Sequence, residues 1–291
     1  MPGFGGVGIY YIVRFIVDET KRDSLETRSN SIAFSFFVSM FPAIIFLFTL
    51  IPHIDQDMVL ANLINDSISK ALPTNASSYL LEIINDITMI KRQGLLSVGF
   101  ILAMYFSSSG ILSLMTGFDK SHLIGYKKRS FFRVQFVALS LTIILATLVL
   151  SSGILIILGD VIINFIDSQI TFLKIHNLIL GLFRYSLAIT LVYITITILY
   201  KYGPSMQNRV SFLNVGSIVA TLASVLSSVL FAFFVNNFSK YNEIYGSIGA
   251  LLVLLLWLKI NAFILLIGFE LNISIMDNKL RSKFTENVVT P

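Results

Sequence analysis

Long apolar stretches recur along the chain and are separated by shorter polar segments. The most continuous lies near the C-terminal end, where nearly every residue from 248 to 267 is apolar. A helix of about 20 residues, rising about 1.5 Å per residue, matches a hydrocarbon core roughly 30 Å thick. Five other stretches have a similar character. The pattern predicts an all-α integral membrane protein with six transmembrane helices, at about residues 31–51, 94–118, 131–158, 177–199, 213–235 and 248–274.

The segments outside these spans are amphipathic or polar. Residues 9–28 carry an apolar stripe at helical spacing, so we expect residues 1–30 to form an N-terminal interfacial helix or a simple lead-in. Residues 52–93 contain two short amphipathic patterns, which predict a helical hairpin on the outer face, either a lid over a cavity or a passive cap. No cleavable signal peptide is evident, so the first span is expected to direct insertion. The predicted organisation is completed by a six-span membrane domain, 31–276, and a loose cytoplasmic tail, 277–291.

Composition supports the membrane interpretation. The 291-residue chain is 55% hydrophobic and only 13% charged, whereas a soluble domain is about 25% charged. Cysteine is absent, which excludes disulfides, thiolate nucleophiles and cysteine-based zinc sites.

The basic residues are unevenly distributed between the two predicted sides. Fourteen of the 21 Lys and Arg residues fall on the side that six spans assign to both termini, and five fall on the other side. The positive-inside rule therefore places the termini in the cytoplasm. The net charge of +5 is explained by this topology and by anionic lipid headgroups at the cytoplasmic face, and it requires no nucleic-acid partner.

Two cations interrupt the predicted spans. Arg184 lies in the fourth span and Lys259 in the sixth, where a central cation costs about 2.5–3.5 kcal/mol on insertion scales. Each is therefore a candidate for binding an anionic headgroup or substrate, and the alternative is a structural hydrogen bond to backbone carbonyls near a kink. Ser107 and Ser108, in a stripe of small residues, are candidates for lining the same path or for close helix packing.

Four further residues have candidate roles in helix geometry or coupling. Glu270 and Asn272, near the end of the last span, could couple a proton or tether helices, with Arg28 among the expected partners of Glu270. Pro42 removes a backbone donor within the first span and predicts a kink. Gly246 is expected at the start of the last helix, as a hinge whose neighbouring amides could hold an anion.

Signatures of known enzymes are not found. The chain has no Walker-type phosphate loop, no His/carboxylate metal spacing and no Gly-x-Ser-x-Gly elbow. We therefore expect a protein that is not an enzyme and that holds no metal or cofactor.

Several short motifs resemble those of the YihY/BrkB-like bacterial inner-membrane proteins, over about residues 10–276. They are Ala33–Pro42, the Tyr200/Pro204 turn, Tyr245-Gly246-Ser247, Leu256-Trp257-Leu258 and Gly268-Phe269-Glu270-Leu271-Asn272. The chain departs from the family pattern at Lys259, Asn261 and Phe269, where an aromatic residue, a small residue and alanine are expected. The resemblance implies a six-span protein of the inner membrane, an association with virulence and serum resistance, and an old label as ribonuclease BN.

The functional expectation follows from these features together. We expect a transporter or flippase-like protein for an amphipathic or anionic envelope component, coupled to a gradient because no ATP-binding motif is present. A membrane scaffold that supports the envelope is the alternative, and a tRNA-processing ribonuclease is the least favoured. Homo-oligomerisation remains open. No inverted repeat relates spans 1–3 to spans 4–6, which weakens the transporter expectation.

Overall fold

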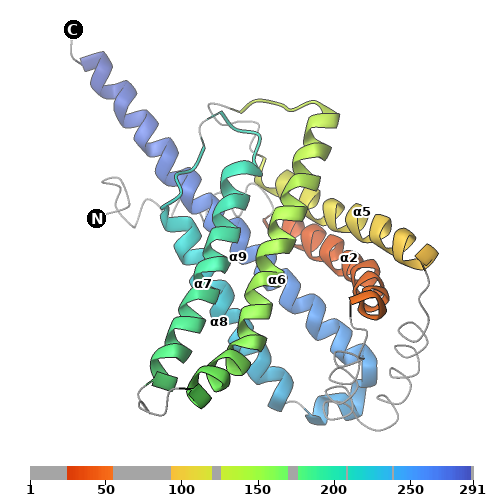
Figure 1. Cartoon of the computed structure of the whole chain (residues 1–291). Helices are drawn as coiled ribbons and strands as arrows, with labels where there is room; N and C mark the ends of the chain where they lie inside the picture. Colours follow the sequence, from red (N-terminus) through yellow and green to blue (C-terminus); the bar gives the residue numbers. More distant parts are fainter. Residues whose placement is uncertain are drawn as a thin grey trace. The chain divides into compact units, whose positions relative to one another are not determined.

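The apolar stretches form long helices in the computed structural model of the chain (Figure 1), which describes residues 25–54, 93–119, 126–169, 176–207, 209–237 and 239–289. The helices in these ranges are α2 (Leu25–Ile54), α5 (Gln93–Phe118), α6 (Phe131–Gln169), α7 (His176–Tyr202), α8 (Val215–Asn237) and α9 (Ser239–Val289). Each contains a segment long and apolar enough to cross a membrane. The all-α membrane fold is therefore confirmed.

Large apolar side chains cover the outward faces of the helices. Phe132 on α6 is 83% exposed, and Leu222, Val229 and Leu230 on α8 are each about 60% exposed. Soluble monomers rarely expose such continuous apolar surface. The lipid chains of a bilayer are the solvent that these faces fit.

Two helices extend well beyond the predicted spans. The sequence predicted that the third span ends at residue 158 and is followed by a loop, but α6 continues to Gln169. Its 39 residues measure about 58 Å, nearly twice a hydrocarbon core. The acidic residues of the predicted loop, Asp160 and Asp167, therefore lie within the continuous helix α6.

Helix α9 is longer than predicted at both ends. It begins at Ser239, so Gly246 lies inside the helix and does not open it. The prediction that a helix start at Gly246 offers free amides to an anion is therefore wrong, because backbone amides within a helix bond to preceding carbonyls. At the other end α9 runs to Val289, so the loose tail expected from residue 277 is helical through that residue.

The chain divides into two compact units. One comprises residues 1–34 and 111–291, and the other comprises residues 35–110. The N-terminal residues 1–24 and most of the predicted 52–93 hairpin lie outside the described residues, so neither prediction is tested.

In the second unit, glycines on α5 allow the aromatic side chains of α2 to approach closely. A Cβ atom built on Gly110 would lie 3.3 Å from the ring of Phe36, and one on Gly99 would lie 3.7 Å from the Cα atom of Phe46. The small-residue stripe of α5 thus makes room for close helix packing.

In the first unit, α6 packs against α7, α7 against α8, and α8 against α9. A buried aromatic cluster joins the ends of α5 and α7 to α9. The ring centroids of Phe118 and Phe269 lie 4.6 Å apart, and that of Tyr200 lies within 5.7 Å of both. The Tyr200 hydroxyl donates a hydrogen bond to the Leu265 carbonyl at 2.7 Å. The cluster fixes the end of α7, where the turn that leads toward α8 begins.

Candidate basic pocket

Arg129 holds the turn that follows α7. Its guanidinium donates hydrogen bonds to three successive carbonyl oxygens, those of Tyr202 at 3.1 Å, Gly203 at 2.8 Å and Pro204 at 2.8 Å. The last carbonyls of a helix have no partner within the helix, and the planar fork of arginine can reach several of them at once. The connection between α5 and α6 therefore closes the C-terminal end of α7.

Asp119, directly after α5, secures the same turn from the other side. Its carboxylate accepts hydrogen bonds from the backbone N–H of Ser205 at 2.8 Å and from the Ser205 hydroxyl at 3.2 Å. The backbone N–H of Lys127 donates to the Ser205 carbonyl at 2.8 Å. A bridge between Tyr126 and Met206 continues this pairing. The α5–α6 and α7–α8 connections are thus joined to each other by hydrogen bonds at the helix ends.

Burial shifts the pKa values of the two charged groups that hold these connections, Asp119 and Arg129. Burial raises the pKa of the Asp119 carboxyl above its ordinary value, against the opposing effects of the Ser205 hydrogen bonds and the Arg129 charge. Burial also lowers the pKa of Arg129, and the positive charges of Arg133 and Arg209 lower it further, whereas Asp119 opposes the shift. Arginine stays protonated in proteins, so the shift of the Arg129 pKa reports mainly its burial, with a smaller repulsion from the nearby Arg133 and Arg209.

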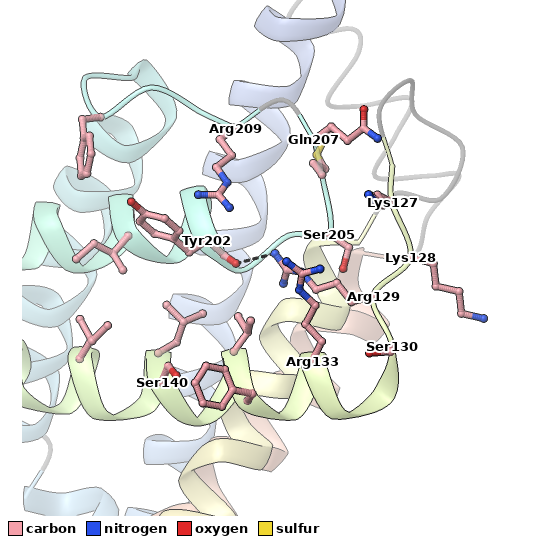
Figure 2. A pocket seen from close by; sticks show the side chains of 17 residues that line it. Lys127, Lys128, Arg129, Ser130, Arg133, Ser140, Tyr202, Ser205, Gln207 and Arg209 are labelled. Carbon is pink, nitrogen blue, oxygen red and sulfur yellow. Dashed lines mark hydrogen bonds between the residues drawn. The ribbon is translucent and has the colours of Figure 1, made fainter.

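A pocket of about 820 Å³ lies beside the joined connections, between α6, α7 and the α7–α8 connection. Its cationic lining residues are Lys127, Lys128, Arg129, Arg133 and Arg209. Figure 2 shows Arg209 reaching from the connection toward the side where Arg129 and Arg133 lie, whereas Lys128 extends away. Among the described residues that line it, none is Asp or Glu. The described lining of the pocket therefore presents positive charge without a carboxylate.

One wall of the pocket is apolar and belongs to the membrane-facing part of the bundle. It is formed by Phe136, Val137, Leu141 and Ile144 of α6 and by Ile198 of α7. Phe136 is 71% exposed and Ile144 is 45% exposed. Cationic and apolar surfaces thus meet within one pocket, a combination that suits an amphiphile with an anionic headgroup.

Aromatic rings that line the pocket contact two cations, Arg209 and Lys201. The Arg209 guanidinium carbon lies 5.1 Å from the centroid of the Tyr202 ring, and the Lys201 ammonium lies 3.6 Å from that of Phe212. Such cation–π contacts are worth about 0.5–1 kcal/mol at exposed sites. They position the charged groups and leave their net charge unchanged.

Of the two sequence-predicted cations, Lys259 is not among the described residues that line this pocket. Lys259 forms an ion pair with Glu26 of α2 at 3.1 Å, a carboxylate partner in place of the expected backbone carbonyls. Glu26 is 76% exposed, and both residues lie within candidate membrane spans. Arg184 lies on α7, and its side chain is outside what the structure describes.

Asn272 and Glu270 lie together on the buried part of α9. The Asn272 side chain accepts a hydrogen bond from the Gly216 N–H and donates one to the Asn214 side chain, both at 2.8 Å. Glu270 is 1% exposed. Arg28, one of its expected partners, donates to the Gly117 carbonyl at 3.3 Å. Tethering and proton coupling both remain predictions for Glu270.

The other predicted residues lie in the second unit. Ser108 is buried on α5, and Ser107 beside it is half-buried. Pro42 lies within the continuous helix α2. The Ser39 hydroxyl donates to the Phe36 carbonyl at 2.7 Å, whereas Pro42 deprives the Val38 carbonyl of its amide partner. The role of Ser107 and Ser108 in lining a path and that of Pro42 as a kink or hinge stay predictions.

Sequence reasoning missed Asp119, Arg129, Arg133 and Arg209 as site residues. Their signal was present, because a basic segment precedes the third span and Gly203-Pro204 marks a turn after the fourth. The basic residues were used only to assign the two sides of the membrane. The hydrogen-bond partners of Arg129 and Asp119 lie more than 70 residues away in sequence. In the described part of the chain, no group of three or more His, Asp or Glu residues is placed to hold a metal ion.

Comparisons with known proteins agree with the motif resemblance. The model of the virulence factor BrkB family matches residues 16–288. A Bacillus subtilis (strain 168) protein, YfkH, whose name describes it as ribonuclease-like, is 27% identical over 85% of this chain and 88% of its own length.

Other relatives carry only a membrane-protein name. A UPF0761 membrane protein of Alteromonas mediterranea is 23% identical over 89% of this chain and 85% of its own length. One from Coxiella burnetii is 21% identical over 89% of this chain and 90% of its own length. No solved structure matches significantly. The family match spans nearly the whole described membrane domain, and the chain therefore belongs to the virulence factor BrkB family.

Proposed function

We propose that this protein is a transporter or flippase-like protein of the bacterial inner membrane, with both termini in the cytoplasm, that handles an anionic amphiphile of the cell envelope. The observation that carries the proposal is the pocket in which Arg129, Arg133 and Arg209 adjoin the exposed apolar side chains of α6. A soluble anion would need only the cations, and an uncharged lipid only the apolar wall. An amphiphile uses both.

The position of the pocket fits the proposed topology. It lies where α6 begins and α7 ends, at the side that the positive-inside rule assigns to the cytoplasm. Basic pockets between transmembrane helices on that side bind anionic headgroups. An inner-leaflet lipid would therefore meet the pocket directly, as the first step of a movement between leaflets.

A scaffold without transport is the second candidate. The described pocket lining reaches the end of α7 at Tyr202, and Arg184 lies 18 residues before Tyr202 on this helix, about 27 Å along the helix axis. A pocket confined to one end of the bundle also suits a protein that anchors lipids and organises partners. The word ribonuclease in the name of YfkH describes that relative, and nothing in the pocket adds to it.

Transport is tested with purified protein in vesicles that contain fluorescent lipids. Movement between leaflets is measured by chemical quenching of the outer leaflet, with and without an imposed proton gradient. We expect movement of anionic lipid above that of protein-free vesicles, and slower movement in the Arg133→Gln/Arg209→Gln variant. Lys240→Gln is the control, because residue 240 lies at the start of α9, whereas the pocket lies between α6, α7 and the α7–α8 connection. Movement equal to that of protein-free vesicles under every gradient would favour the scaffold.

A further inference from the structure

The cations of the pocket differ in whether their donor groups already make hydrogen bonds within the protein. Arg129 uses its guanidinium for three backbone carbonyls, so it supplies mainly charge. Arg133 and Arg209 line the same space and are exposed, and the Arg209 charge rests over the Tyr202 ring. These two guanidinium groups, together with Lys127, are placed to engage a ligand.

The lining selects against headgroups that carry their own positive charge. In the part of the chain that the structure describes, none of the lining residues is Asp or Glu, and the neighbouring carboxylate of Asp119 already accepts two hydrogen bonds from Ser205. The ammonium of a zwitterionic headgroup would meet five cationic side chains and no carboxylate among the described lining residues. Phosphatidylethanolamine-type lipids are therefore disfavoured at this site.

Charge balance further narrows the ligand class. Arg129, Arg133 and Arg209 lie close enough that the last two lower the pKa of the first. A phosphodiester carries one negative charge, whereas a terminal phosphate carries about −1.5 to −2 at pH 7 and three acceptor oxygens. Arginine binds phosphate oxygens through paired hydrogen bonds. A terminal phosphate can therefore relieve more of the repulsion and occupy both available guanidinium groups.

The apolar wall indicates that the ligand enters from the bilayer. Phe136 and Ile144 are eight residues apart on α6 and both are exposed, so the wall extends about 12 Å along the helix axis. Leu141 and Ile198 continue it between α6 and α7. A pocket of about 820 Å³ lies within the range of about 300–1,000 Å³ that small-molecule sites occupy.

We infer that this pocket binds a membrane lipid whose headgroup ends in a phosphomonoester, with the phosphate between Arg133 and Arg209 and the start of an acyl chain along Phe136, Leu141 and Ile144. The inference rests on the proposed function in using the same pocket, and it names the substrate class. The phosphate neutralises the cation cluster, and the chain covers the exposed apolar wall.

The test compares lipids that share acyl chains and differ in the headgroup. Native mass spectrometry of the detergent-purified full chain measures binding of phosphatidic acid, phosphatidylglycerol and phosphatidylethanolamine. We expect phosphatidic acid to bind at least about tenfold more tightly than phosphatidylglycerol, a difference equivalent to about 1.4 kcal/mol. We also expect phosphatidylethanolamine to bind most weakly. Equal or tighter binding of phosphatidylglycerol would overturn the inference.

Variants locate the binding. Arg133→Gln and Arg209→Gln should each weaken phosphatidic acid binding about tenfold, whereas Lys240→Gln should leave it unchanged. Size-exclusion chromatography checks folding, and Arg209→Lys, which keeps the charge, replaces Arg209→Gln if that variant aggregates. Unchanged binding in folded Arg133→Gln and in the folded position-209 variant would overturn the inference.

A soluble phosphomonoester separates a lipid site from a free phosphate site. Glycerol 3-phosphate, added at the lipid concentration, should not displace phosphatidic acid, and Ile144→Ala should weaken only the lipid. Displacement at equal concentration would assign the pocket to a soluble phosphate and overturn the lipid assignment. Preferential binding without any transbilayer movement would contradict the proposed function alone. Movement of anionic lipids without a phosphomonoester preference would contradict this inference alone.

Discussion

The Asn272 side chain of α9 caps the first turn of α8, because its Oδ1 atom accepts a hydrogen bond from the Gly216 N–H at 2.8 Å. Its amide nitrogen donates to Oδ1 of Asn214 at 2.8 Å, and that same oxygen accepts from the Ser217 N–H at 2.7 Å. An amide on one helix and an N-cap on another thus satisfy two of the free donors of α8 together. Asn272 is 5% exposed, so water cannot readily replace these bonds.

Replacing Asn272 with alanine should destabilise the protein by about 1–3 kcal/mol, because the Gly216 donor would be left buried without its acceptor. The midpoint of thermal unfolding, followed by size-exclusion chromatography in detergent, should fall. Asn261→Ala is the matched control, since the Asn261 amide donates to the Trp257 carbonyl of its own helix at 2.9 Å. An equal loss in both variants would show that the contact between α8 and α9 contributes nothing specific.

The same contact depends on two glycines. A methyl group on Gly216 would collide with the carbonyl oxygen of Gly268, and one on Gly268 would lie 2.5 Å from the Tyr200 hydroxyl oxygen. Gly216→Ala should therefore separate the two helices, lower the folded yield and break the Asn272 hydrogen bond. Gly181→Ala is the control, because open space surrounds that position and alanine favours a helix by about 1 kcal/mol. A normal yield and unfolding midpoint for Gly216→Ala would contradict the close approach.

Sequence patterns predicted the helices well because bilayer thickness imposes a minimum apolar length that is visible in the sequence. They predicted the ends of α6 and α9 poorly, because a helix that leaves the apolar layer can continue in water. They also directed attention to Arg184 and Lys259, the cations inside the spans. The pocket instead combines two polar connections that only the folded chain brings together, and periodicity within a span carries no information about that pairing.

Arg129 is expected to control the shape of the α7–α8 connection. In Arg129→Lys the charge remains, but a single ammonium cannot reproduce the planar fork that reaches three carbonyls. The turn should loosen, and trypsin should cleave after Arg209 several-fold faster than in the wild type. Cleavage rates at this bond are measured by mass spectrometry of the folded, detergent-purified protein.

Arg133→Lys provides the matched control for that measurement. Arg133 lines the same pocket but lies within the first turn of α6, so its substitution should leave the turn after α7 and the cleavage rate after Arg209 unchanged. If the two variants are cleaved equally fast, the hydrogen bonds of Arg129 do not hold the connection.

Asp119 should make the stability of the protein depend on pH. Burial raises the pKa of its carboxyl in the folded state, so folding favours the protonated form. The resulting stabilisation is fully present below the unfolded pKa, about 3.9, and is lost as the pH rises through the higher folded pKa. In Asp119→Asn this contribution disappears, because the amide does not titrate.

The difference in unfolding midpoint between the wild type and Asp119→Asn should therefore shift in favour of the wild type as the pH falls from 7.5 toward 4.5. Subtracting one protein from the other removes the titration of groups that they share. The amide oxygen of the substituted side chain can still accept the Ser205 N–H bond, so the variant should fold. A difference that is constant with pH would show that Asp119 titrates normally. A shift in favour of the variant at low pH would show that the Ser205 hydrogen bonds and the Arg129 charge outweigh burial and lower the pKa of the carboxyl.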